Sequence, residues 1–146
     1  MSLVGGVEDL QLLVRHRDSM GNPQYGAYLV QEYVRKPGRD IRVTVVGDRA
    51  VAAIYRYAVN DDWRTNTARG GKAEAVRVDP ELEDISVRAT KAIGAYYAGV
   101  DVVESDGGYK VLEVNTVPEF KNVQRVTGVN VARHIVELVL DLTKRG

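Results

Sequence analysis

Two short turns, each set between stretches of alternating side chains, constrain this chain more than any other feature. Residues 41–45 and 51–56 alternate in character around Gly47-Asp48, a Gly-X pair suited to a two-residue hairpin turn. A second hairpin is expected from Val100–Glu104 and Tyr109–Asn115. Turns this short leave only antiparallel pairing between neighbouring strands. The chain is therefore expected to build an antiparallel-rich sheet.

Helical periodicity surrounds these hairpins. A first helix is expected from Val7, with an extended, strand-like segment over Ala27–Val34 after it. A second helix begins after the N-cap candidate Asp79, and its spacing predicts that six side chains face the sheet: Leu82, Ile85, Ala89, Ala92, Ile93 and Tyr96. A third helix runs from about Asn130, with an apolar stripe of Val131, Ile135, Leu138, Val139 and Leu142. The predicted fold class is α+β, an antiparallel-rich sheet with flanking helices on one face.

Composition excludes several classes of function. Twenty basic and twenty acidic residues cancel, so no global field favours nucleic acid or a membrane surface. The absence of cysteine excludes disulfides, a thiolate nucleophile and cysteine-ligated zinc, and is compatible with a cytoplasmic location. No apolar run approaches the roughly 18 residues of a membrane helix, and no signal peptide is visible. Arginine outnumbers lysine fourteen to six, and arginine suits phosphate and carboxylate contacts.

Polar ligands stand out in the second hairpin. Glu113 and Asn115 share one face of a strand that is otherwise rich in Val and Leu, and such oxygen donors suit Mg²⁺. A regular strand would put Tyr109 and Val111 on that same face. Asp101 would oppose Glu113 if the hairpin loop had three residues, whereas a two-residue loop would put Val100 there. The alternative is an exposed strand face with ordinary salt bridges.

Arginines gather in and around the first hairpin. Arg42 and Arg56 lie on its strands, and Arg64 and Arg69 follow in a polar segment with Thr65 and Asn66. Converging guanidinium groups could neutralise a triphosphate or an acyl phosphate. The alternative is a solvated hairpin whose arginines have no shared role.

Five motifs follow one another along the chain: Gln31-Glu32-Tyr33-Val34, Gly38–Arg42, Arg64–Gly71, Gly99-Val100-Asp101 and Glu113-Val114-Asn115. In these motifs and their order the chain resembles the RimK-like branch of the ATP-grasp superfamily. Lys36–Asp40 and Pro118–Asn122 look most like the LysX group, which joins an amino acid to the C-terminal glutamate of the small acidic carrier LysW. The near alternative adds glutamate to the C-terminus of a small-subunit ribosomal protein.

The resemblance implies ATP and Mg²⁺, with Mn²⁺ as a substitute, as cofactors of an ATP-dependent carboxylate–amine ligase. It implies nucleotide contacts from Gln31, Glu32, Tyr33, Val34, Asp40, Arg42, Arg56, Arg64, Thr65 and Asn66. Arg42 and Arg69 would be catalytic, and Asp101, Glu113 and Asn115 would bind the metal. Thr116–Asn122 would border the amino-acid pocket.

The family also has an N-terminal domain and a central subdomain that supply lysines and a glycine-rich loop to the nucleotide. We therefore expect residues 1–146 to be a C-terminal ATP-grasp subdomain, inactive alone, with 1–3 as an added leader. A carrier or ribosomal protein and an amino acid are the expected substrates, and a homo-oligomer is compatible with them. The open alternatives are a nucleotide-binding module without catalysis and an α+β interaction domain in which the charged clusters merely pair.

Overall fold

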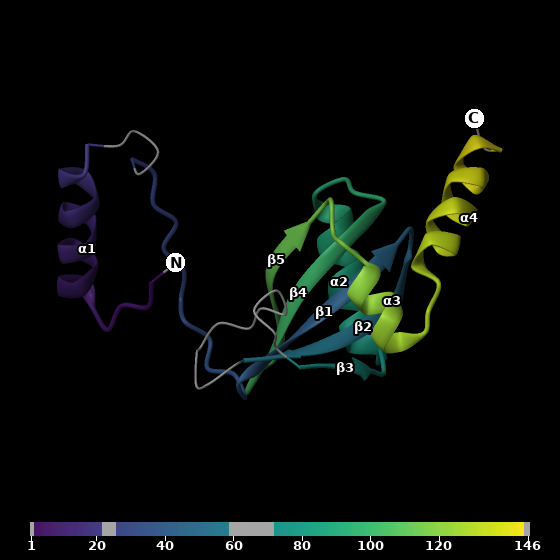
Figure 1. Cartoon of the computed structure of the whole chain (residues 1–146), viewed down its shortest axis with the longest axis horizontal. Coiled ribbons are helices and arrows are strands. Elements are labelled where there is room, and N and C mark those ends of the chain that lie inside the picture. Colours follow the sequence, from purple (N-terminus) through teal and green to yellow (C-terminus); the bar gives the residue numbers. More distant parts are fainter. Residues whose placement is uncertain (1, 22–25, 59–71, 145–146) are drawn as a thin grey trace. The chain divides into compact units, whose positions relative to one another are not determined.

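The computed structural model describes residues 2–21, 26–58 and 72–144 and divides the chain into two compact units. The first, Met1–Val34, holds helix α1 (Val7–Ser19), and the second, Arg35–Gly146, holds the sheet (Figure 1). We call them the N-terminal unit and the sheet domain. No helix in the described ranges combines the length and the apolar character needed to cross a membrane.

The N-terminal unit confirms the first helix but not the strand expected after it. Helix α1 buries none of its residues, and Tyr28 Oη donates a 2.6 Å hydrogen bond to Asp18 Oδ1. Ala27–Val34 is described throughout and contains no β-strand, so that prediction is wrong. A strand exists only where a neighbour accepts and donates its backbone hydrogen bonds, and this segment has no such neighbour among the described strands. Leu29 remains 86% exposed.

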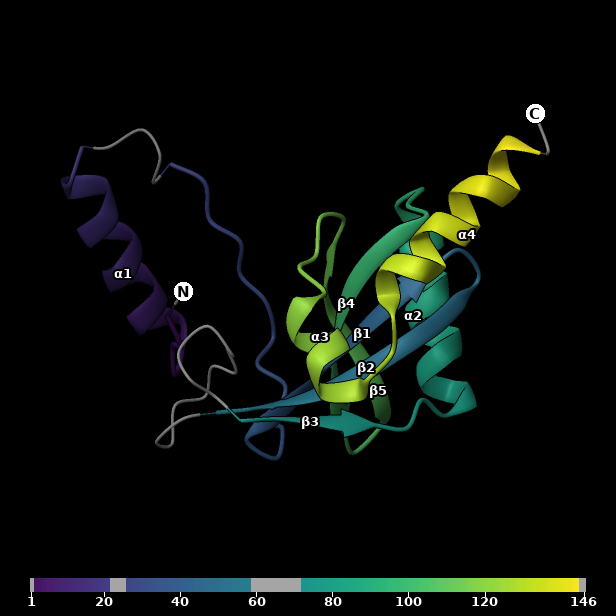
Figure 2. The same ribbon diagram turned by 45° about the vertical axis from the view of Figure 1, so that its right-hand side comes forward.

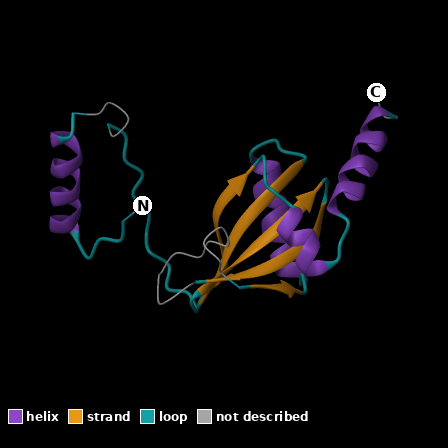
Figure 3. Cartoon of the chain, in the orientation of Figure 1, coloured by secondary structure: helices purple, strands orange, loops and turns teal. Residues whose placement is uncertain are grey.

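The sheet domain confirms the antiparallel sheet. Its five strands are β1 (Arg39–Val46), β2 (Arg49–Tyr57), β3 (Ala73–Val76), β4 (Tyr97–Ser105) and β5 (Gly108–Asn115). They pair antiparallel in the order β3-β2-β1-β4-β5 (Figure 3). The expected Gly47-Asp48 turn joins β1 to β2, since Val46 pairs with Arg49 and Gly47 has a φ of 62°. The short edge strand β3 was not predicted.

Helices cover both faces of the sheet, not one as expected. Helix α2 (Pro80–Ala92) packs Leu82 on the face that contains Val43 and Ala53. Helices α3 (Lys121–Thr127) and α4 (Val131–Thr143) pack Val123 and Val131 on the opposite face, against Ile54. In Figure 1, α2 lies behind the sheet and α3 in front of it, and the sheet still separates them in the turned view of Figure 2. The chain returns over the front face after β5, and α3 was not predicted.

The predicted N-cap Asp79 is confirmed, but the predicted helix faces are only partly right. Asp79 Oδ1 accepts the Leu82 amide at 2.8 Å, and Asn130 Oδ1 accepts the Arg133 amide at 3.0 Å. Helix α2 ends at Ala92, so Ile93 is its C-cap and is 51% exposed. The buried row of α2 is Leu82, Ser86 and Thr90, whereas Ala92, Ile93 and Tyr96 are exposed. In α4, Val131 is buried but Val139 and Leu142 are exposed.

Candidate functional site

One face of the sheet carries a row of charged side chains. In the β1–β2 register Asp40 pairs with Arg56, and in the β1–β4 register Arg42 pairs with Asp101. Cross-strand partners point to the same side of a sheet. These four side chains therefore share the face that α3 and α4 cover further along, opposite the face packed by α2.

A β-bulge in each hairpin builds this face. The turn residues Gly47-Asp48 alone would put Asp40 opposite Tyr55, but the register shifts by one residue at Val51 and puts Arg56 there. Without this shift, the alternation along β2 would send Tyr55 to the charged face and Arg56 to the α2 face. Tyr55 instead packs against the core on the α2 side.

The second bulge sets which residue of β4 lies opposite Glu113, one of the predicted metal ligands. The loop between β4 and β5 has two residues, because Ser105 pairs with Gly108, so the three-residue loop is wrong. One extra residue, Leu112, then shifts the register, and Asp101 pairs directly with Glu113. The predicted pairing is therefore confirmed, by a different cause.

The same bulge corrects the predicted strand face. Tyr109, Val111 and Val114 all pack against the α2 side, so Glu113 does not share a face with Tyr109 and Val111. Asn115 pairs with Gly99, which lies two residues before Asp101, and so it joins Glu113 on the charged face.

Within the row, the charges are joined by short contacts. Arg42 donates to both carboxylate oxygens of Asp101, through Nε to Oδ1 and through Nη2 to Oδ2 at 3.0 Å. Arg56 Nη2 lies 2.8 Å from Asp101 Oδ2. Arg56 also donates to both oxygens of Asp40, at 2.7 and 2.8 Å, and Lys36 Nζ lies 3.9 Å from Asp40. Arg42 and Arg56 thus converge on Asp101, and Arg56 is also paired with Asp40.

Burial makes this row energetically demanding. Asp40 is 4% exposed and Arg56 is 8% exposed. Desolvation lowers the pKa of Arg56, but its hydrogen bonds and charge interactions with Asp40 and Asp101 outweigh that effect and raise it. Burial lowers the pKa of Lys36 more than the neighbouring Asp40 raises it. Because burying charges costs free energy unless they are paired, such a row is expected mainly where function requires it.

The carboxylates and the carboxamide fit a hard cation by their chemistry. A carboxylate offers about four lone-pair positions, and the arginines take three at Asp101. Asn115 Oδ1 accepts the Val117 amide at 2.9 Å, and an amide oxygen has a second lone pair. Glu113 is exposed and forms no ion pair with the described residues. No cluster of three or more His, Asp or Glu side chains suited to a metal occurs in the described ranges.

The remaining predicted site residues lie elsewhere. Gln31, Glu32, Tyr33 and Val34 belong to the N-terminal unit and are described apart from the sheet domain. Arg64, Thr65, Asn66 and Arg69 fall outside the described residues. Sequence reasoning missed Lys36, whose spacing of four residues before Asp40 was the available signal, and it assigned no role to Gly99.

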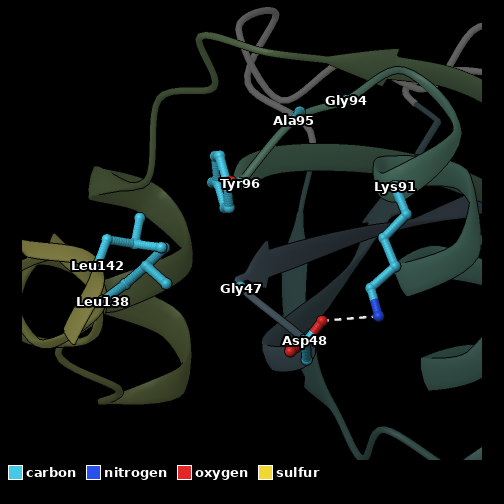
Figure 4. Close-up of a pocket in the computed structure, with 8 residues that line it drawn as sticks. All are labelled: Gly47, Asp48, Lys91, Gly94, Ala95, Tyr96, Leu138 and Leu142. Atoms are coloured by element: carbon cyan, nitrogen blue, oxygen red, sulfur yellow. Dashed lines mark ion pairs between the residues drawn. The ribbon is translucent and has the colours of Figure 1, made fainter. Parts of the chain in front are cut away.

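The structure also contains a small pocket that holds none of these residues. It has a volume of about 250 Å³ and lies between the β1–β2 turn, the end of α2 and helix α4. Figure 4 shows Lys91 paired with Asp48 at its edge, with Nζ and Oδ1 2.7 Å apart, and Leu138 and Leu142 on the opposite wall. The charged face is therefore the candidate site.

The chain is similar in sequence to known proteins over most of its length. Residues 8–139 match the RimK-like ATP-grasp domain. The chain is 44% identical over 120 residues to the alpha-aminoadipate–LysW ligase LysX of Sulfurisphaera tokodaii, covering 81% of this chain and 41% of LysX. It is 35% identical over 140 residues to the glutamate–LysW ligase ArgX of the same organism, covering 95% of this chain and 50% of ArgX.

A solved structure agrees with the fold. The ATP-grasp ligase PsnB, complexed with a phosphomimetic variant of its minimal precursor, Mg and ADP, superposes with a TM-score of 0.59 at 26% identity. That match covers 75% of this chain and 34% of PsnB. The chain spans half or less of the length of the relatives named here. Since the family match extends over nearly all of the sheet domain and most of the N-terminal unit, this chain belongs to the RimK-like ATP-grasp family.

Proposed function

We propose that the charged face is the phosphate and magnesium end of the nucleotide site in an ATP-dependent carboxylate–amine ligase. One observation carries the proposal: two arginines converge on Asp101, which lies opposite a second carboxylate, Glu113. Guanidinium groups suit phosphate oxygens, and paired carboxylates suit the cation that accompanies them. Family membership and the relatives that are named as ligases support this reading.

The proposed reaction has two steps. A carboxylate oxygen of the acceptor attacks the terminal phosphorus of ATP, ADP leaves, and an acyl phosphate forms. The amine of an amino acid then attacks the acyl carbon, phosphate leaves, and an amide results after loss of a proton. Arg42 and Arg56 would hold phosphate oxygens and offset their charge, which is the main requirement of phosphoryl transfer. Asp101, Glu113 and Asn115 would hold Mg²⁺, which supplies charge neutralisation when bound.

We propose the C-terminal glutamate of a LysW-type carrier as the acceptor and aminoadipate or glutamate as the amine. The support is that two relatives are named as LysW ligases, one for each amino acid. Residues outside the described ranges, Arg64, Thr65, Asn66 and Arg69, would complete the phosphate site, with Arg69 beside the acyl phosphate. Gln31–Val34 would contact the adenine. A cytoplasmic location and a homo-oligomer belong to the same proposal.

We further propose that this chain is the C-terminal part of the enzyme. The chain covers 41% of LysX, and the family's lysines and glycine-rich loop would come from the rest of the protein. Catalysis by positioning requires both halves of the cleft. The 146-residue chain alone should therefore fold but not hydrolyse ATP. Measurable ATPase or ligase turnover by this chain would contradict the proposal.

The test uses the chain extended to the full length of its relatives. Incubation with ATP, Mg²⁺, a LysW-type carrier and either aminoadipate or glutamate should raise the carrier's mass by one amino-acid residue. A carrier that lacks its terminal glutamate is the matched control and should stay unmodified. A ribosomal-protein C-terminal peptide tests the alternative acceptor. Nucleotide binding without any amide product would instead favour a non-catalytic module.

A further inference from the structure

Gly99 lies at the point where the charged face and the returning chain meet. It is buried in β4, two residues before Asp101, and pairs with Thr44 on one side and Asn115 on the other. A Cβ atom built on Gly99 would lie 2.8 Å from Pro118 Cβ, closer than real Cβ atoms approach. It would also lie 3.1 Å from Arg42 Nη1 and 3.3 Å from Arg42 Cδ. The space above Gly99 is thus shared by a proline and by the arginine that binds Asp101.

Residues 116–118, which lie over Gly99, are held by hydrogen bonds at Val117 and at Pro118. Asn115 Oδ1 accepts the Val117 amide at 2.9 Å and so turns the chain immediately after β5. Tyr97 Oη donates a 2.9 Å hydrogen bond to the Pro118 carbonyl oxygen, and Pro118 is buried. The Tyr97 ring packs edge-on against Phe120, 6.5 Å between centroids, and thereby holds the next residues as well. Residues 116–118 therefore have little freedom to rise away from β4.

Arg42 has equally little freedom. Its guanidinium donates to both oxygens of Asp101, and this pairing holds the side chain beside Gly99. A flexible side chain could normally yield to an added methyl group by turning its far end. Here that movement would break the pairing with Asp101.

We propose that Gly99 is a positioning residue, whose missing side chain sets how close Arg42 and residues 116–118 lie to the sheet. Through these two contacts Gly99 fixes Asp101 and Asn115 relative to each other. Its effect on ligand binding rests on the proposed function, in which these residues hold phosphate and Mg²⁺. The contacts themselves do not depend on that function.

The test compares Gly99→Ala with Gly107→Ala. Gly107 lies in the β4–β5 turn, has no positive φ, and has open space where a Cβ would go. In NMR spectra of the 146-residue chain, Gly99→Ala should shift the Arg42 Nε–H, the Asn115 side-chain amide and the Val117 amide. Gly107→Ala should shift only signals of its own turn. Unchanged Arg42 and Asn115 signals in a folded Gly99→Ala variant would overturn the proposal.

A second variant guards against simple misfolding. Pro118→Gly removes the Cβ atom closest to the added methyl group, so Gly99→Ala/Pro118→Gly should recover the wild-type Arg42 signal in part. If Gly99→Ala unfolds and the double variant does too, the packing conflict lies elsewhere and the proposal fails.

Calorimetry with ADP and Mg²⁺ measures the effect of each substitution on nucleotide affinity. Gly99→Ala should bind about tenfold more weakly than wild type, and Gly107→Ala within about twofold. If neither the 146-residue chain nor the chain extended to the full length of its relatives binds ADP, the proposed function fails, while the NMR comparison still decides the role of Gly99.

Discussion

Glu113 lies directly opposite Asp101, although the two-residue turn between β4 and β5 would by itself put Glu113 opposite the buried Val100. The extra residue Leu112 moves the register by one. A one-residue slip sends every later side chain to the other face of the sheet. The bulge thus keeps Glu113 out of the core, where an unpaired carboxylate would be costly, and adds it to the charged face.

Deleting Leu112 should therefore be tolerated. Without it, Val111, Glu113, Val114 and Asn115 would alternate as a regular strand and keep their partners on β4. Leu112 is exposed, so little burial is lost, and we expect a loss of less than about 1 kcal/mol in unfolding free energy.

Deleting Val114 is the matched control. Whichever way the strand adjusts, either Glu113 or Asn115 then faces the buried Val100. The expected loss is about 3 kcal/mol or more. Urea unfolding of the two deletions gives the comparison, and equal losses would show that the bulge does not set the register.

Asp40→Asn should be strongly destabilising. The change leaves one side-chain oxygen to accept from the buried Arg56, so one of the two hydrogen bonds is lost and the guanidinium has less compensating charge. Breaking one partner of a buried ion pair costs about 3 kcal/mol. Asp84→Asn, in an exposed pair with Arg88, should cost less than about 0.5 kcal/mol. Chemical denaturation checks both variants, and a similar small cost for each would mean that burial of the row contributes little.

Sequence reasoning succeeded where local chemistry decides the structure. The Gly47-Asp48 turn, the N-cap Asp79 and the start of the last helix near Asn130 each depend on a few adjacent residues, and all three are confirmed. It failed where the structure depends on distant partners. Ala27–Val34 has strand composition but no hydrogen-bonded neighbour among the described strands, and Ile93 has the right spacing but lies past the end of α2.

The bulges explain why the candidate site could be only half predicted. Neither Val51 nor Leu112 is a glycine or a turn-forming residue, so the local sequence does not predict a bulge at either position. The pairing of Asp40 with Arg56 depends on the bulge at Val51 and was not predicted. The pairing of Asp101 with Glu113 was predicted through a three-residue loop that the structure does not contain.

The stability of the sheet domain should depend on the ionisation of Asp79. The Leu82 amide and the Tyr109 hydroxyl donate to this carboxylate and lower its pKa. A lowered folded-state pKa stabilises the fold above the unfolded value of about 3.9, and that stabilisation is lost as pH falls through the folded value. Asp79→Asn should therefore be less stable than wild type at neutral pH, with the difference shrinking below about pH 4.

Thermal unfolding across this pH range gives the measurement. Tyr109→Phe removes one of the donors to Asp79, so the same pH-dependent difference should be smaller in that background. A difference between wild type and Asp79→Asn that stays constant down to pH 2 would exclude this linkage.

Glu113→Gln should reduce the magnesium dependence of nucleotide binding. The substitution keeps the size and shape of the side chain and removes its charge. Asp101 already accepts from two arginines, so the exposed Glu113 supplies negative charge that no described ion pair offsets. A hard cation binds through such charge, and we expect Mg²⁺-dependent ADP affinity to fall about tenfold.

Glu137→Gln, in an exposed pair with Arg133 on α4, is the matched control and should leave the affinity unchanged. Calorimetry of ADP with and without Mg²⁺ measures the effect for each variant. If Glu113→Gln binds ADP with wild-type magnesium dependence, the cation is not held by this pair of strands.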